Sequence, residues 1–213
     1  MRWIAAIGAM LMLAAALLIG PARAQEVVQQ LPPPATDRVA LDTSAGRIVL
    51  EIETDRAPVT AANFLRYVDH HRLDGVKFYR VVKVDTRWGF VQFGVQNARD
   101  RVYPPIAHEP TTQTGLTHSD GTITVARAEP GTGQGEFVIV LGDQSGAFDA
   151  HRDAEGDGDK LGNAAFGRVV EGMDVLLSIF DAPVSDTATI QGVFQGQVPE
   201  EPVTILKAER VAE

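Results

Sequence analysis

Cysteine does not occur in the 213 residues, and positive charge is scarce, because 19 Lys and Arg stand against 28 Asp and Glu. Without cysteine the chain has no disulfide bond and no thiol nucleophile. The net charge of −9 repels a phosphate backbone, so we expect no nucleic-acid partner. The sequence therefore predicts a domain whose stability comes from its hydrophobic core alone.

Long hydrophobic runs are also absent, except near the N-terminus, where residues 3–20 carry no charge. Arg2 precedes this run, and small residues follow it at the two positions that signal peptidase reads, Ala22 and Ala24. A run of this length is nearly long enough to cross a bilayer as an uncleaved anchor. The small residues have no role in an anchor, so the pattern favours a signal peptide, residues 1–24, that is cleaved after Ala24.

Removing 24 of the 213 residues would leave 189, which suits one domain with a sizeable core. It would also remove Arg2 and Arg23 and move the net charge from −9 to −11. Residues 25–38 are rich in proline and glutamine and predict an extended linker. We therefore expect a periplasmic or secreted monomer, with its domain in residues 39–213 and no membrane contact after cleavage.

Strand patterns dominate the domain. Short runs of alternating apolar residues, bounded by turn residues, predict strands. They lie in a hairpin at 38–53 and at 76–82, 90–95, 121–127, 136–142, 164–170 and 202–211. A helical period occurs only at 57–71 and 171–180. Since strands do not alternate with helices, an antiparallel barrel or sandwich is favoured, and the two helices are suited to plug the open ends of a barrel.

Several segments resemble, in order, the cyclophilin family of peptidyl-prolyl isomerases. They are FYRVV at 78–82, the strand around Gln92, GTGQGEFVIVLGD at 131–143 and AAFGRVVEGMDVL at 164–176. The helix DRAPVTAANFLRYV also matches the first helix of that family, and the resemblance runs from Val39 to Ala212. It implies a mainly β fold, a closed eight-stranded antiparallel barrel capped by two short α-helices. It also implies a groove that binds unfolded or proline-containing protein segments.

Isomerisation of an X–Pro bond needs little chemistry from the protein. Amide resonance creates a barrier of about 18–20 kcal/mol, and this resonance is lost in the twisted state. A fixed donor near the altered nitrogen and carbonyl favours the twisted state over both planar states. Arginine suits this role because it stays protonated and offers several N–H donors in a rigid fork. No cofactor and no metal ion is required.

The resemblance assigns roles to nine residues. Arg80 matches the catalytic arginine of the family, and Gln92 matches the glutamine beside it. The positions implied to bind substrate are Phe78, Phe90, Ala126, Phe137, Val138, Phe148 and Asn163. Phe78, Arg80 and Val82 share one face of a regular strand, so we expect Arg80 to lie where an apolar face borders an open cleft.

The chain departs from the family at several of these places. Residues 83–89 (KVDTRWG) are longer than the usual turn, so Trp88 and Phe90 both compete for the proline pocket, and we choose Phe90. Val138 makes the pocket shallower, while Arg127 and Glu136 replace amide side chains that usually bind peptide backbone. Arg127 and Glu136 are also able to pair with each other.

Two functions follow from the sequence. One is a peptidyl-prolyl isomerase that accelerates the folding of exported proteins, with Arg80 and Gln92 as catalytic residues. The other is a chaperone-like module on the same barrel that grips proline segments with little or no turnover. The acidic run 153–159 resembles a calcium loop, but Ala164 stands where an EF-hand needs a glutamate, so we expect a solvated loop and no metal.

Overall fold

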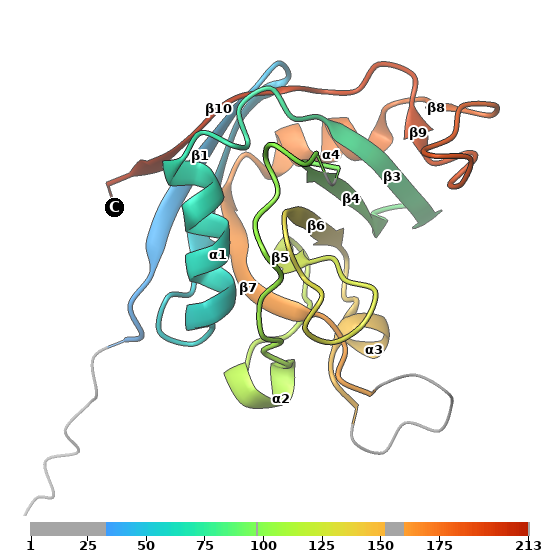
Figure 1. Cartoon of the computed structure of the whole chain (residues 1–213). Coiled ribbons are helices and arrows are strands. Elements are labelled where there is room, and N and C mark those ends of the chain that lie inside the picture. The colour runs from blue at the N-terminus through green and yellow to red at the C-terminus, as the bar shows by residue number, and fades with distance from the viewer. Residues whose placement is uncertain (1–32, 97, 152–159, 213) are drawn as a thin grey trace, which may run out of the picture. The chain divides into compact units, whose positions relative to one another are not determined.

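The structure of this chain is a computed structural model that describes residues 33–96, 98–151 and 160–212 (Figure 1). The predicted signal peptide, linker residues 25–32 and the acidic run 153–159 lie outside the described residues. Within the described part, no helix is long and apolar enough to cross a membrane.

Eight strands form one antiparallel sheet in the order β10-β1-β2-β7-β5-β6-β4-β3. Their bounds are β1 Asp37–Thr43, β2 Gly46–Ile52, β3 Phe78–Asp85, β4 Trp88–Gly94, β5 Thr122–Val125, β6 Glu136–Leu141, β7 Ala164–Glu171 and β10 Ile205–Val211. All the predicted strands are therefore confirmed, with shifts of a few residues at their ends. A separate two-stranded pair, β8 (Val184–Ser185) and β9 (Val198–Pro199), is not among the predictions.

The sheet curls strongly but does not close fully. Its edge strands β3 and β10 meet where Lys77 bridges Thr204, and the N–H of Phe78 donates to the carbonyl of Val203 over 2.9 Å. Further along β3, the N–H of Val81 donates to the carbonyl of Gln197 instead, over 2.8 Å. "Closed barrel" is thus an overstatement, because part of the edge of β3 pairs with the segment before β9 rather than with β10.

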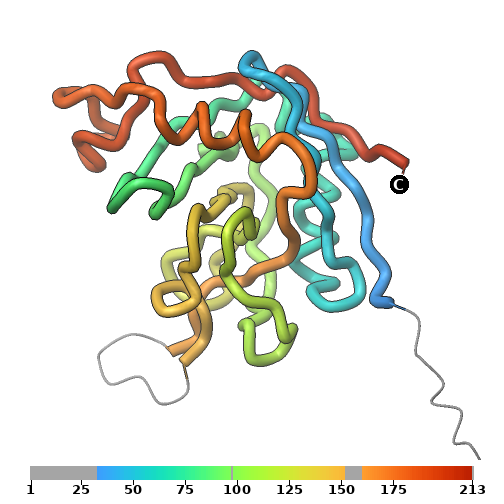
Figure 2. Tube along the Cα trace, turned by 180° about the vertical axis from the view of Figure 1, so that it is seen from behind, coloured from blue at the N-terminus to red at the C-terminus, as the bar shows by residue number. Residues whose placement is uncertain are grey.

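Four helices accompany the sheet in the described residues, where the sequence predicted two. The predicted pair are α1 (Pro58–Asp69), which lies against β7 and β10, and α4 (Met173–Asp181), which lies against β2, β3 and β4 (Figures 1 and 2). The other two, α2 (Thr111–Thr114) and α3 (Ser145–Phe148), are single turns of four residues. So short a helix has no apolar periodicity for sequence analysis to detect.

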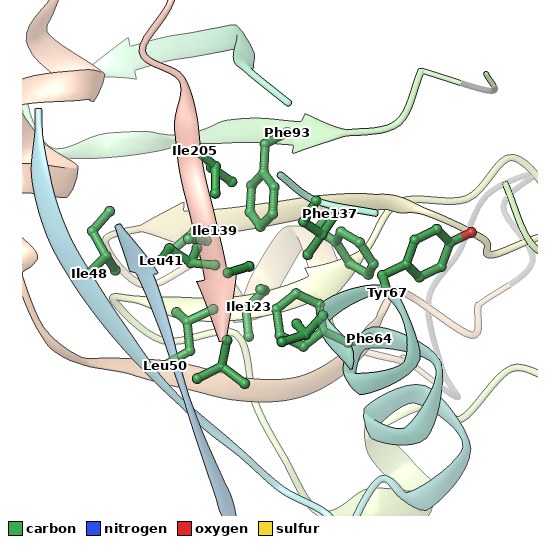
Figure 3. Close-up of a cluster of buried hydrophobic side chains, with 14 of the residues drawn as sticks. Leu41, Ile48, Leu50, Phe64, Tyr67, Phe93, Ile123, Phe137, Ile139 and Ile205 are labelled. Carbon is green, nitrogen blue, oxygen red and sulfur yellow. The ribbon is translucent and has the colours of Figure 1, made fainter. Parts of the chain in front are cut away.

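The core lies between the curled sheet and the helices (Figure 3). Phe64 of α1 packs edge-on against Phe137 of β6, with ring centroids 5.0 Å apart. Leu41 and Leu50, from the first two strands, are also fully buried in this cluster. Alternation along the strands places these side chains on one face, and their bulk fills the interior of the sheet.

The β3–β4 connection explains the long segment 83–89. Lys83 pairs with Gly89 and Asp85 with Trp88, so the extra residues lengthen both strands and the turn lies at Thr86 and Arg87. The insertion therefore extends the β3–β4 hairpin, and none of residues 83–89 lines the cavity described below.

Candidate functional site

Arg80 leaves the core because the strand β3 contains a bulge. The register between β3 and β4 shifts between Phe78, which pairs with Phe93, and Arg80, which pairs with Gln92. Phe78 and Val81 are both buried in the core, three residues apart, so the regular alternation is broken between them. Bulges commonly re-aim side chains beside functional sites. Arg80 therefore does not share the face of Phe78, contrary to the expectation from strand alternation.

The guanidinium of Arg80 is held by side chains from two segments, the strand β4 and residues 194–197. Its Nη1 donates to Oε1 of Gln92 over 3.1 Å, and its Nε donates to Oε1 of Gln197 over 2.7 Å. Its Cζ lies 3.8 Å from the ring centroid of Phe194 and 5.1 Å from that of Phe90. Partial burial lowers the pKa of Arg80, yet an arginine keeps its proton in proteins, so the group remains a cation.

A directed chain of hydrogen bonds continues from Arg80 to Glu136. The amide nitrogen of Gln92 donates to the hydroxyl of Tyr79 over 2.6 Å, and that hydroxyl donates to Oε2 of Glu136 over 2.5 Å. Burial and the neighbouring Glu136 carboxylate raise the pKa of Tyr79, so it remains a donor. The chain orients the Gln92 amide, with its oxygen toward Arg80 and its nitrogen toward Tyr79.

A cavity of about 500 Å³ opens beside Arg80. Seven of the nine predicted site residues line it, namely Arg80, Phe90, Gln92, Ala126, Val138, Phe148 and Asn163. The rings of Phe90 and Phe148 stand 6.0 Å apart, nearly perpendicular, and form an apolar corner. The structure thus brings a cation and an apolar cup together, the two elements expected for gripping and twisting an X–Pro bond.

Phe78 and Phe137 do not line this cavity. Both side chains are fully buried, and both rings pack against Phe93, at centroid distances of 5.0 and 5.6 Å. This placement corrects the expectation that they bind substrate, because a side chain without exposed surface cannot touch a peptide. Phe90 lines the cavity, as chosen, while the indole N–H of Trp88 donates to the carbonyl of Asp143 over 3.0 Å.

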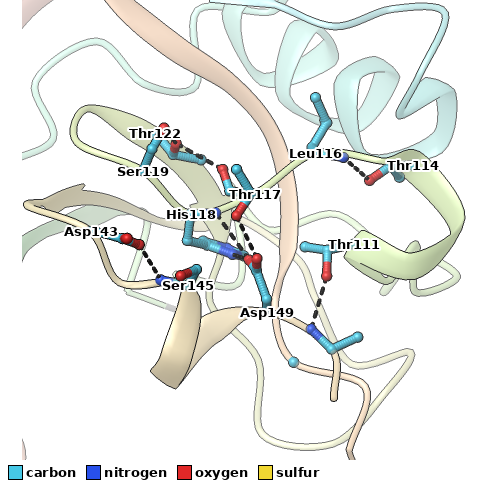
Figure 4. Close-up of polar contacts among 12 residues, drawn as sticks. Thr111, Thr114, Leu116, Thr117, His118, Ser119, Thr122, Asp143, Ser145 and Asp149 are labelled. Carbon is cyan, nitrogen blue, oxygen red and sulfur yellow. Dashed lines mark hydrogen bonds and ion pairs between the residues drawn. The ribbon is translucent and has the colours of Figure 1, made fainter. Parts of the chain in front are cut away.

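Phe148 is fixed by a polar cluster around the next residue, Asp149 (Figure 4). The carboxylate of Asp149 accepts from the hydroxyl of Thr117 over 2.5 Å, and from the backbone N–H and the ring Nδ1 of His118 over 3.0 and 2.5 Å. His118 has no exposed surface, and its ring lies 5.5 Å from that of Phe148. Burial lowers the pKa of His118 although the Asp149 hydrogen bond opposes this.

The two charged replacements have their own contacts. Nε of Arg127 donates to the carbonyl of Gly162 over 2.9 Å, just before Asn163. Glu136 accepts from Tyr79, as described, and from the backbone N–H of Gln96. Each of these side chains therefore supports the wall of the cavity.

Sequence reasoning missed Phe194 and Gln197. Both lie in residues 184–199, which contain β8 and β9 and which we call the C-terminal arm. The arm has neither a long strand pattern nor a helical period, and its two contacts with Arg80 span more than a hundred residues of sequence. The only local signal is an aromatic residue among glycines and glutamines, which is too common to interpret.

Comparisons with known proteins agree with this geometry. Residues 38–210 match the family model described as cyclophilin type peptidyl-prolyl cis-trans isomerase/CLD. A peptidyl-prolyl cis-trans isomerase of Streptomyces antibioticus is 35% identical over 171 residues, which cover 80% of this chain and 96% of that protein. One of Acinetobacter baylyi is 30% identical over 176 residues, covering 82% and 86%.

Solved structures show the same fold. A Cryptosporidium parvum cyclophilin type peptidyl-prolyl cis-trans isomerase superposes with a TM-score of 0.66 at 15% identity, covering 84% of this chain and 99% of that one. A structure of it in the presence of the dipeptide Ala-Pro gives a TM-score of 0.64 at 16% identity, covering 83% and 99%. The chain belongs to the cyclophilin-type peptidyl-prolyl cis-trans isomerase family.

Proposed function

We propose that this protein catalyses cis–trans isomerisation of X–Pro bonds in exported proteins and that Arg80 stabilises the twisted imide. The observation that carries the proposal is the position of the Arg80 guanidinium. It borders a cavity with an apolar corner formed by Phe90 and Phe148, and it is held by Gln92 over 3.1 Å. A cation in this setting favours a state whose charge distribution differs from that of both planar amides.

The guanidinium has N–H groups left for a substrate. Arginine offers five N–H donors. Among the described residues, Gln92 and Gln197 accept from two of them. The remaining donors can bond to the twisted imide, whose nitrogen is pyramidal and basic and whose carbonyl has lost conjugation. Because Arg80 is already oriented by the protein, little ordering is needed when the bond twists.

The apolar part of the cavity grips the proline ring in this proposal. Phe90 and Phe148 provide aromatic walls, and Val138, which is 4% exposed, forms a shallow floor between them. Burial of a proline ring here excludes water from the guanidinium and strengthens its interaction with the imide. Ala126, a small side chain in the cavity wall, leaves room for the peptide.

Action on exported proteins is supported by the predicted signal peptide, residues 1–24. Newly exported chains arrive unfolded and carry X–Pro bonds of both isomers, which interconvert in tens to hundreds of seconds without a catalyst. The relatives named above are isomerases by name, two of them bacterial. We therefore propose that the protein acts as a monomer, in the periplasm or outside the cell.

A binding module without turnover is the second candidate. The observation in its favour is that Arg80 is covered on one side by Phe194, at 3.8 Å, and bonded at Nε and Nη1 to protein amides. A guanidinium so engaged has less freedom to follow a rotating imide. In that case the cavity would hold proline segments as a chaperone does.

A protease-coupled assay on an Ala-Pro-Phe peptide separates the two candidates. We expect the purified domain to accelerate isomerisation and Arg80→Ala to reduce kcat/KM by about 100-fold or more, the cost of removing a preorganised donor. Arg47→Ala is the matched control, since Arg47 is exposed on β2 and pairs with Asp42. Peptide binding without any acceleration would select the binding module instead.

A further inference from the structure

Hydrogen bonds within the C-terminal arm give it a defined conformation. Its tip is closed by two hydrogen bonds between Ile190 and Val193, of 2.8 and 3.0 Å, with Gln191 and Gly192 both at positive φ in the turn. Two central residues with positive φ are typical of a tight β-hairpin turn. The side chain of Gln195 donates to the carbonyl of Asp186 over 2.6 Å and ties the two sides of the arm together.

The arm is fastened to the edge strand that carries the arginine. The backbone N–H of Val81, the residue after Arg80, donates to the carbonyl of Gln197 over 2.8 Å. In Figures 1 and 2 the arm accordingly lies beside β3. This bond anchors the backbone of Gln197, so the position of its side chain relative to Arg80 is set by the sheet.

Gln92 on β4 and Gln197, just before β9, hold the guanidinium from two different segments. Oε1 of Gln197 accepts from Nε over 2.7 Å, and Oε1 of Gln92 accepts from Nη1 over 3.1 Å. A guanidinium is planar, so two acceptors at separate nitrogens determine both its place and its in-plane rotation. Gln92 alone would leave the group free to pivot about Nη1.

Phe194 supplies the third constraint. Its ring centroid lies 3.8 Å from Cζ of Arg80, within the range of a cation–π contact. The backbone at Phe194 has φ 62°, which is rare for an aromatic residue, and the side chain remains 40% exposed. A strained backbone that displays an apolar ring at a cavity is typical of a functional position.

We propose that Phe194 and Gln197 are positioning residues for Arg80 and that the C-terminal arm is thereby part of the isomerase site. Gln197 holds Nε, and Phe194 covers one face of the guanidinium, so that its free N–H groups point into the cavity that Phe194 also lines. The proposal rests on the proposed isomerase function for its kinetic consequences, whereas the geometry of Arg80 is measurable without any activity.

The first test compares two variants of Gln197 with nearly the same shape. Gln197→Glu keeps an acceptor oxygen at the same place, while Gln197→Leu removes it. We expect the leucine variant to lower kcat about tenfold with KM little changed. The reason is that displacing a catalytic group weakens the stabilisation of the transition state more than it weakens substrate binding. The glutamate variant should retain most of kcat. NMR exchange spectroscopy on an Ala-Pro peptide yields both constants.

The matched control is Gln113→Leu, the same change at an exposed residue of α2. Gln113 lies outside the arm and does not line the cavity. If Gln113→Leu lowers kcat as much as Gln197→Leu, or if Gln197→Leu is as active as the unaltered protein, the role of Gln197 is wrong. The same holds if the glutamate and leucine variants lose activity equally.

A second pair tests Phe194. Phe194→Trp preserves an aromatic face for the guanidinium, and Phe194→Leu preserves only apolar bulk. We expect kcat to survive the first change and to fall several-fold after the second, about threefold to tenfold for the loss of a cation–π contact. Full activity of the leucine variant would overturn the part assigned to Phe194.

A readout independent of catalysis is the ¹⁵N–¹H signal of Nε of Arg80, assigned by its loss in Arg80→Lys. We expect slow hydrogen exchange at Nε that becomes fast in Gln197→Leu, and a ring-current shift that disappears in Phe194→Leu. An unprotected Nε in the unaltered protein would refute the positioning role. If instead Nε is protected but the protein does not catalyse isomerisation, the arm geometry stands and the proposed function fails.

Discussion

The amide nitrogen of Gln92 lies 2.6 Å from the hydroxyl of Tyr79, and this bond joins one of the two proposed catalytic residues to the residue before Arg80. Tyr79 is the bulged residue of β3, and its hydroxyl donates a hydrogen bond to the carboxylate of Glu136. The orientation of Gln92, and through it of Arg80, therefore depends on a tyrosine outside the cavity wall.

Removal of this hydroxyl should weaken catalysis. In Tyr79→Phe the Gln92 amide loses an acceptor and is free to flip, and the net loss of one such bond is about 1–1.5 kcal/mol, or roughly tenfold in kcat/KM. The protease-coupled assay measures it. Tyr103→Phe is the control, because Tyr103 bonds to His70 and lies between the guanidinium groups of Arg66 and Arg72. Equal losses in the two variants would contradict the proposed route.

Phe137 and Phe148 should separate stability from binding. Phe137 is fully buried, so Phe137→Leu should lower the free energy of unfolding by roughly 1–2 kcal/mol and leave KM unchanged. Phe148 lines the cavity, so Phe148→Leu should raise KM several-fold with a smaller effect on stability. Urea denaturation and peptide kinetics on both variants check this. A KM effect larger at Phe137 than at Phe148 would reverse our assignment.

Stability should fall in mild acid because of His118. Its pKa in the folded state lies below the ordinary value of 6.5, since the ring is buried. Below pH 6.5 the unfolded chain therefore binds a proton that the folded chain does not, and the free energy of unfolding decreases until the folded-state pKa is reached. Urea midpoints between pH 7.5 and 5 measure the slope.

In His118→Asn the free energy of unfolding at pH 7 should be lower than in the unaltered protein. Its further decrease between pH 7 and pH 5 should, however, be smaller. Asp149, the partner of His118, is retained in this comparison. His151→Asn is the matched control, because it makes the same change at an exposed histidine. An unaltered slope in His118→Asn would show that other groups cause the acid sensitivity.

Glu109 should matter for folding although it is remote from the cavity. It is 2% exposed, and its carboxylate accepts from the backbone N–H groups of Val59 and Thr60 over 3.1 and 2.7 Å, at the start of α1. Glu109→Ala leaves the buried N–H of Thr60 without this partner and should cost about 1–3 kcal/mol of unfolding free energy. Thermal denaturation tests this, with the exposed Glu129→Ala as control. A shift no larger than that of the control would disprove it.

Much of the fold was predictable because it depends on local patterns. Alternation at 46–52 and the helical period at 58–69 specify which faces are apolar, and burial of those faces requires a layered antiparallel arrangement. Arg80 and Gln92 were predicted from the resemblance to the cyclophilin family, and they do lie opposite each other on β3 and β4. These features involve residues within one element or on neighbouring strands.

The errors have a different origin. Phe78 and Phe137 were placed in the cavity by matching positions, but a bulge at Tyr79 separates the face of Phe78 from that of Arg80. A bulge arises where a strand must satisfy pairing on both sides, and no residue type at Tyr79 demands one. Residues 83–89 extend β3 and β4, and the sequence did not predict this because strand pairing depends on both partner strands.

The sequence by itself determined the antiparallel sheet with its two main helices, because these depend on periodicity and residue type, and its resemblance to the cyclophilin family indicated the family and the arginine of the site. Only the tertiary structure decided how that arginine is held. Phe194 and Gln197 reach it from the far end of the chain, and their contacts exist only when the edge of β3 meets the C-terminal arm. Such long-range pairing is set by the summed packing of the whole domain.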